Sequence, residues 1–189
     1  MRRPLLTAWF ALFSLPALAQ PVTLAELEGF VVEGRVVVDQ RLHREGRDIS
    51  VQRHERMRFV FYPDNVIEWE LTSTGYSPRG AKKGPTRKGK FVLGKVLEAR
   101  SLGGGQAVYT FEDGTLTSLR TYGGAGGYKR AVSFKRDKSG ALTCSVSETF
   151  MREDGVGRVT LNSAVDGKSI TVLSAKQVSS NCTLSRNSN

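Results

Sequence analysis

Apolar and polar residues alternate with a period of two along much of the chain, a pattern that predicts β-strands with one buried face. The clearest example is the segment 56–71, where two alternating runs flank a three-residue loop, Pro63-Asp64-Asn65. This loop length gives the cross-strand pairs Phe61–Ile67, Phe59–Trp69 and Met57–Leu71, with Arg58 opposite Glu70 on the other face. One register therefore satisfies apolar packing and charge pairing together, and the segment is predicted to be a β-hairpin.

A second unit spans residues 106–134 and is predicted to hold three consecutive strands. Asp113-Gly114 separates the first two, and this dipeptide is typical of a type I′ turn because both central residues need a positive φ. The glycines of 123–127 interrupt the next connection. They do not have the spacing of a dinucleotide-binding loop, and a strand rather than a helix follows, so they are interpreted as a hairpin linker.

The remaining pattern adds one helix and several strands. Thr23 and Glu26 have capping-box spacing, which predicts a short helix over 24–28 ended by Gly29. A valine-rich strand follows over 30–38. Further strands are expected over 91–96, 158–164 and 169–178. Another is expected where Leu142, Cys144, Val146 and Phe150 share a face against Tyr128, Val132 and Phe134.

These elements predict an all-β protein, an antiparallel meander of about nine or ten strands with one short N-terminal helix. A closed or nearly closed barrel is the expected arrangement, because closure removes exposed strand edges. A two-sheet β-sandwich is the alternative. The stretch Leu27-Glu28-Gly29-Phe30 and the strand after it resemble the entrance of lipocalin-type barrels, and the chain resembles small exported proteins of Gram-negative bacteria. The tryptophan usual in lipocalins is missing, so this resemblance implies no site residues.

The first 19 residues have the pattern of a secretory signal peptide. Arg2 and Arg3 precede an apolar run over 5–15, and Ala17-Leu18-Ala19 fits a signal-peptidase site. The run is too short to span a bilayer, which needs roughly 17–25 apolar residues. We therefore expect a periplasmic or secreted protein in which 20–189 form a single β domain.

Charge and cysteine content refine this picture. Without Arg2 and Arg3 the chain has 26 basic and 18 acidic residues, a net charge of +8. Such a surplus favours anionic partners, among them lipopolysaccharide and anionic lipid. Cys144 and Cys182 are the only cysteines. Since no C-x-x-C motif or nearby histidine suggests a redox or metal site, they are predicted to form a disulfide that joins the C-terminal segment to the core.

The segment 75–90 has an unusual composition, rich in glycine, proline and basic residues and without an acid. We expect a flexible, exposed basic loop, which could act as a solubilising surface or as an anion-binding site. The candidate anion-binding residues are Arg79, Lys82, Lys83, Arg87, Lys88 and Lys90. No aromatic residues are interleaved with them, so the segment gives no specific nucleic-acid signal.

Two functional hypotheses follow. The first is a non-enzymatic binding protein for an apolar or amphipathic ligand inside the barrel, with Phe59, Phe61, Trp69 and Tyr109 as candidate ligand-binding residues that could equally fill the core. The second is an envelope-associated protein that binds anionic surfaces through the basic loop. No motif indicates catalytic residues, a metal site or a cofactor, and a hydrolase or hydrolase inhibitor is a weaker alternative.

Overall fold

The computed structural model describes residues 20–93, 96–98, 106–121, 127–151, 159–162 and 169–187. The predicted signal peptide and the glycines of 122–126 lie outside the described residues. One helix and twelve strands are present in the described part: α1 Leu24–Leu27, β1 Phe30–Arg44, β2 Arg47–Phe61, β3 Val66–Ser77, β4 Gly80–Lys83, β5 Arg87–Val92, β6 Val96–Glu98, β7 Gln106–Glu112, β8 Thr115–Thr121, β9 Gly127–Arg136, β10 Leu142–Met151, β11 Val159–Asn162 and β12 Ser169–Arg186. Among these residues no helix has the length and apolar character needed to cross a membrane.

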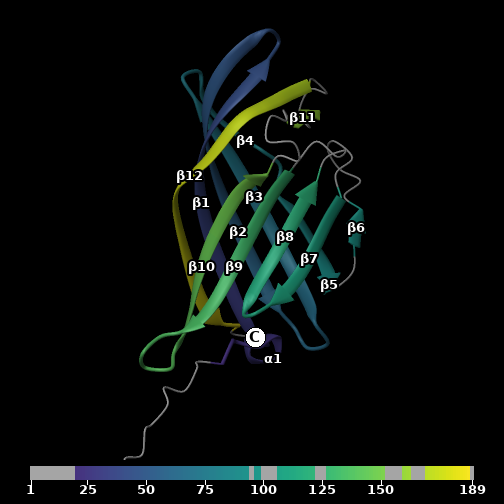
Figure 1. The fold of residues 1–189 in the computed structure, drawn as a ribbon, viewed down its shortest axis with the longest axis vertical. Helices are drawn as coiled ribbons and strands as arrows, with labels where there is room; N and C mark the ends of the chain where they lie inside the picture. Colours follow the sequence, from purple (N-terminus) through teal and green to yellow (C-terminus); the bar gives the residue numbers. More distant parts are fainter. Residues whose placement is uncertain are drawn as a thin grey trace, which may run out of the picture.

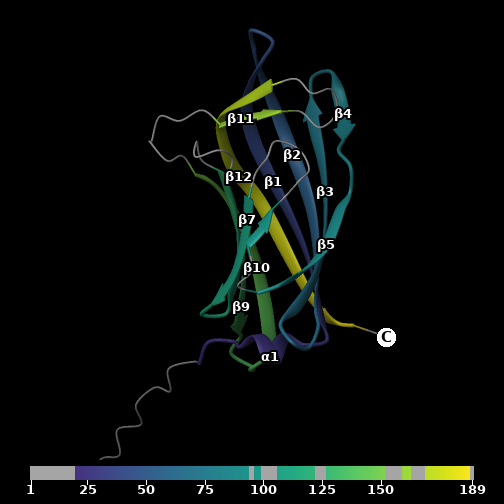
Figure 2. The ribbon, with the colours of Figure 1, turned by 90° about the vertical axis from the view of Figure 1, so that its right-hand side faces the viewer.

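The strands form two antiparallel sheets that face each other (Figures 1 and 2). Sheet A has the order β11-β12-β1-β2-β3-β4, and β5 also pairs with β3. Sheet B has the order β10-β9-β8-β7-β6. The all-β, antiparallel character is confirmed. Among the described strands neither sheet closes on itself, so the predicted closed barrel is wrong and a sandwich-like arrangement fits better.

Side chains, rather than a backbone ladder, join the two sheets where their edges meet. At one seam the Glu148 backbone N–H on β10 donates to the Gln177 side chain on β12, at 2.6 Å. The predicted disulfide between Cys144 and Cys182 joins the same two strands. Across the sandwich, the rings of Phe91 on β5 and Tyr109 on β7 stack with centroids 3.8 Å apart. These contacts hold the layers together without the continuous hydrogen bonding that a barrel requires.

The hairpin predicted over 56–71 is confirmed with its register. Phe61 pairs with Ile67, Phe59 with Trp69, and Arg58 with Glu70. The turn places Asp64 and Asn65 at φ values of 62° and 59°, in the left-handed region that asparagine and aspartate tolerate better than most residues.

The short helix is confirmed close to its predicted bounds. The Thr23 backbone N–H donates to the Glu26 carboxylate at 2.7 Å, and this contact fixes the start of α1. Gly29, at φ 74°, follows the helix and allows the chain to turn into β1. The helix covers one end of the sandwich (Figure 1) and buries Leu27 completely.

The core lies near α1, where aromatic rings from the two sheets meet. Phe61 of sheet A packs edge-to-face on Phe134 of sheet B, with centroids 5.7 Å apart. Valines and isoleucine from alternating positions complete the packing: Val32, Val36, Val38, Ile67, Val132 and Val146 are buried. The apolar residues of the alternating pattern thus face inward from both sheets, as predicted from the sequence.

The predicted flexible loop 75–90 contains two short strands, β4 and β5, so the prediction of an irregular loop is wrong for this part. Both strands pair with β3. Gly89 pairs with Trp69, and a Cβ at Gly89 would lie 3.1 Å from the indole nitrogen. Glycine in this strand therefore makes room for the indole, and its presence does not indicate a loop.

A comparison of Gly114 with Gly46 tests how closely the turn between β7 and β8 is packed. The Asp113-Gly114 turn joins β7 and β8 with φ values of 47° and 70°, and a Cβ at Gly114 would lie 2.9 Å from the Phe134 backbone oxygen. Gly46 has a similar φ of 75° with nothing within 4 Å. We expect Gly46→Ala to cost about 1–2 kcal/mol from backbone strain. Gly114→Ala should cost at least about 1 kcal/mol more because of the clash. Urea unfolding of both variants measures the difference, and equal losses would contradict the packing at this turn.

Candidate functional site

A cavity of about 420 Å³ is lined by residues of both sheets. Much of its lining comes from the ends of β1, β2 and β4 that lie opposite α1 in the ribbon (Figure 2). Inward-facing positions of β1, β2 and β3 form one wall, and residues of β8 and β9 form part of the other. Part of the lining is apolar: Leu42, Ile49, Val51, Leu71, Ile170 and Val172. Basic residues also line the cavity: Arg44, Lys82, Lys83, Arg87 and Arg120. The hollow is therefore amphipathic, with an excess of positive charge.

Two buried glutamates and two largely shielded arginines form a closed ring of ion pairs beside this cavity. Arg53 and Glu55 project from β2, with Arg53 Nη1 2.5 Å from Glu55 Oε1. Arg130 on β9 and Glu148 on β10 are cross-strand partners, with Arg130 Nε 2.7 Å from Glu148 Oε2. Arg53 also pairs with Glu148, and Arg130 with Glu55. Each carboxylate thus meets both guanidinium groups, and the ring links the two sheets.

The ring is well shielded from water. The side chains of Glu55 and Glu148 are 3% and 1% exposed, and those of Arg53 and Arg130 are 15% and 17% exposed. Burial disfavours the charge of Arg53, but Glu55 and Glu148 outweigh it and raise the pKa of the guanidinium. Burial likewise acts to raise the pKa of Glu55, but Arg130 and Arg53 outweigh it and lower that pKa. For Glu148, burial prevails over the attraction of Arg130 and raises the pKa.

Neutral polar groups complete this layer. The Gln40 side-chain amide donates to the Tyr128 hydroxyl at 2.9 Å, and the Arg53 guanidinium lies 4.9 Å from the centre of the Tyr128 ring. Gln177 accepts from the Glu148 backbone. The Nε–H of Arg53 is buried and has no hydrogen-bond acceptor among the described residues. A polar layer therefore separates the apolar core near α1 from the cavity, and it borders the cavity through Gln40, Tyr128 and three members of the ring, Arg53, Glu55 and Arg130.

The four aromatic residues predicted to bind an apolar ligand lie in the core and not on the wall of this cavity. Phe59, Phe61 and Tyr109 are buried, and Trp69 packs against them while half-buried. Their neighbours are other core side chains, such as Phe91 against Tyr109. These four aromatic residues therefore fill the core, which is the alternative to ligand binding that was considered for them.

The six basic residues predicted to bind anions do not form one surface. Lys82, Lys83 and Arg87 line the cavity. Arg79 lies at the exposed turn between β3 and β4, and Lys88 is exposed on β5. Lys90 pairs with Glu68 at 2.6 Å. Three of the six basic residues thus line the cavity, and the other three do not.

The sequence analysis missed the ring itself, although a signal for it was present. The inward-facing alternation Met57, Phe59, Phe61 continues backward to Glu55 and Arg53. Arg130 on β9 and Glu148 on β10 each take an inward-facing position in a strand whose other inward-facing residues are mostly apolar. Charged residues at inward positions of otherwise apolar strands, on three strands at once, indicate a buried ionic cluster.

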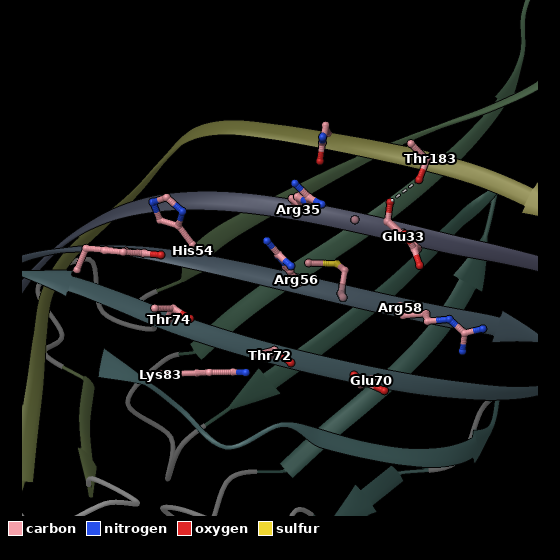
Figure 3. Close-up of a pocket in the computed structure, with 14 residues that line it drawn as sticks. Glu33, Arg35, His54, Arg56, Arg58, Glu70, Thr72, Thr74, Lys83 and Thr183 are labelled. Atoms are coloured by element: carbon pink, nitrogen blue, oxygen red, sulfur yellow. Dashed lines mark hydrogen bonds between the residues drawn. The ribbon is translucent and has the colours of Figure 1, made fainter. Parts of the chain in front are cut away.

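A second hollow, of about 720 Å³, lies on the outer face of sheet A (Figure 3). It is a polar groove across β12, β1, β2 and β3, and the labelled side chains of Arg35 and Arg56 stand near its middle. The two hollows thus lie on opposite faces of the same sheet, and Lys83 on β4 lines both of them. No protein-family model, curated protein or solved structure matches this chain.

Proposed function

We propose that this is an exported, non-enzymatic binding protein whose cavity holds an amphipathic ligand with an anionic head group. The observation that carries the proposal is the lining of the cavity between the sheets, which combines apolar walls with basic side chains. Its volume of about 420 Å³ lies within the range of small-molecule sites, about 300–1,000 Å³. An alkyl or similar apolar group would contact Leu42, Val51 and Leu71.

The charge balance supports an anionic head group. Glu55 is the only carboxylate among the described residues that line the cavity. It belongs to the ring, in which two carboxylates neutralise two guanidinium groups. Lys82 and Arg120 approach the cavity from strands outside the ring. An anionic head group that reaches either of these side chains would gain charge-assisted hydrogen bonds.

An exported location is part of the proposal. It is supported by the signal-peptide pattern of residues 1–19 and by the disulfide between Cys144 and Cys182, since such bonds persist in oxidising compartments.

Isothermal titration calorimetry with dodecyl phosphate tests the proposal. We expect saturable binding with one ligand per chain below the critical micelle concentration. The double variant Lys82→Gln/Arg120→Gln should raise the Kd about tenfold or more, because one charge-assisted hydrogen bond is worth about 1.5–3 kcal/mol and a tenfold change is about 1.4 kcal/mol.

A matched control removes the same charge elsewhere. Lys129 and Lys135 are exposed and do not line the cavity. Lys129→Gln/Lys135→Gln should leave the Kd within about twofold at moderate salt, because distant exposed charges are screened. Equal losses in both double variants, or no binding by the original protein, would contradict the proposal.

A further inference from the structure

Rows of side chains cross the groove on the outer face of sheet A. Each row consists of residues that lie opposite each other on neighbouring strands. In one row, Glu33 pairs with Arg58, Arg58 with Glu70, and Glu70 with Lys88. Opposite charges thus alternate across four strands. Opposite-charge pairs in this arrangement stabilise a sheet, so this row needs no external partner.

The next row does not alternate in charge. Arg35 on β1 lies opposite Arg56 on β2, with Asn181 and Thr72 on the outer sides of the pair. Like charges directly opposite each other on one sheet face are destabilising. Both arginines are exposed, and within the described part of the chain neither one forms an ion pair. Figure 3 shows the two side chains next to each other on the groove floor. The pair is therefore suited to an anion supplied from outside.

Hydroxyl groups lie beside the arginine pair, and two aromatic rings lie further along the same groove. The His54 and Tyr76 rings lie with centroids 4.5 Å apart, and Tyr76 is 44% exposed. Thr72, Thr74 and Thr183 add hydroxyl groups to the groove. An exposed ring can pack against the apolar face of a sugar, while threonine and asparagine side chains exchange hydrogen bonds with sugar hydroxyls.

We propose that this groove binds an acidic saccharide, with one carboxylate, sulfate or phosphate between Arg35 and Arg56 and a neighbouring sugar ring near Tyr76. Arginine suits this role because its planar group can bind an oxyanion through two parallel hydrogen bonds. Glu33 and Glu70 at the other end of the groove disfavour a polymer charged at every unit. They can accept hydrogen bonds from hydroxyls, so a sparsely charged saccharide fits better than a nucleic acid.

The arginine pair lies on the face of sheet A opposite the cavity, and Arg35, Arg56 and Tyr76 do not line the cavity. Lys83 on β4 lines both hollows, so no test variant replaces it. The inference goes beyond the proposed function, and either of the two can fail without the other.

A hyaluronan hexasaccharide, which has a carboxylate on every second ring, is a suitable probe. We expect saturable binding by isothermal titration calorimetry that weakens with added sodium chloride. Arg35→Gln/Arg56→Gln should raise the Kd at least tenfold. Tyr76→Ala should raise it about two- to tenfold, the loss expected for one aromatic contact. Circular dichroism confirms that each variant is folded, and the two independent substitutions keep the test valid if one of them is not.

Two control variants and one competing ligand show which results would contradict the proposal. Arg47 and Arg79 are exposed and lie outside the groove, so Arg47→Gln/Arg79→Gln should leave the Kd within about twofold. The cavity variant Lys82→Gln/Arg120→Gln should also bind the hexasaccharide normally. Absence of binding, equal losses in the arginine control, or tighter binding of a single-stranded oligothymidylate of matched length would overturn the assignment.

Discussion

Glu148→Ala is expected to lower the free energy of unfolding by about 3–5 kcal/mol, the range observed when one partner of a buried ion pair is removed. Glu148 is nearly inaccessible and contacts both Arg53 and Arg130. Its loss leaves two largely shielded guanidinium groups to share one carboxylate, Glu55, so one positive charge is no longer compensated. Urea unfolding followed by the fluorescence of Trp69 measures the change.

Two comparison variants separate this effect from a general loss of charge. Asp48 forms an exposed ion pair with Arg41 and a hydrogen bond with His43, so Asp48→Asn should change stability far less than Glu148→Ala. The fourfold replacement Arg53→Met/Glu55→Leu/Arg130→Met/Glu148→Leu removes every charge of the ring and should be close to neutral or stabilising. If Glu148→Ala costs no more than Asp48→Asn, the ring does not have the buried, paired arrangement described above.

Replacing both cysteines, Cys144→Ser/Cys182→Ser, should cost about 4 kcal/mol in the chain-entropy description of disulfides. The bond closes a loop over a sequence separation of 38 and joins β10 to β12 where no backbone ladder connects them. Thermal and urea unfolding measure the loss. Hydrogen exchange should show faster opening of β10 than of β8, which has strands on both sides.

The control for the disulfide is a substitution of similar size on the same strand. Ser145 is an exposed neighbour of Cys144, and Ser145→Ala should change stability by no more than about 0.5 kcal/mol. A double cysteine variant that loses less than about 1 kcal/mol, with β10 protected as before, would show that the seam does not depend on the covalent bond.

Local elements were predictable because neighbouring residues determine them. The turns at Asp64-Asn65 and Asp113-Gly114 need residues that tolerate a positive φ, and the alternation beside each turn fixes the register. The first hairpin was only partly predicted. Glu45-Gly46 forms its turn with φ values of 50° and 75°, but the charged residues around it concealed the long strands on either side.

The choice between a closed barrel and two separate sheets could not be made from the sequence, because it depends on side-chain contacts between strands that are distant in sequence. The same applies to the cavity. Arg53 and Arg130 appear in the sequence as ordinary charges, and only their placement opposite each other across the sandwich makes them a buried ring. Rules based on composition assign such residues to the surface, since buried arginine and glutamate are rare unless they are paired.

Photo-crosslinking tests the central claim most directly. A dodecyl phosphate with a diazirine on its alkyl chain is bound, irradiated, and located by peptide mass spectrometry. The proposed function predicts crosslinks on the cavity wall, at Leu42, Val51 and Leu71, that decrease in Lys82→Gln/Arg120→Gln. Crosslinks confined to exposed residues such as Val178, at an unchanged level in that variant, would contradict a ligand held between the sheets.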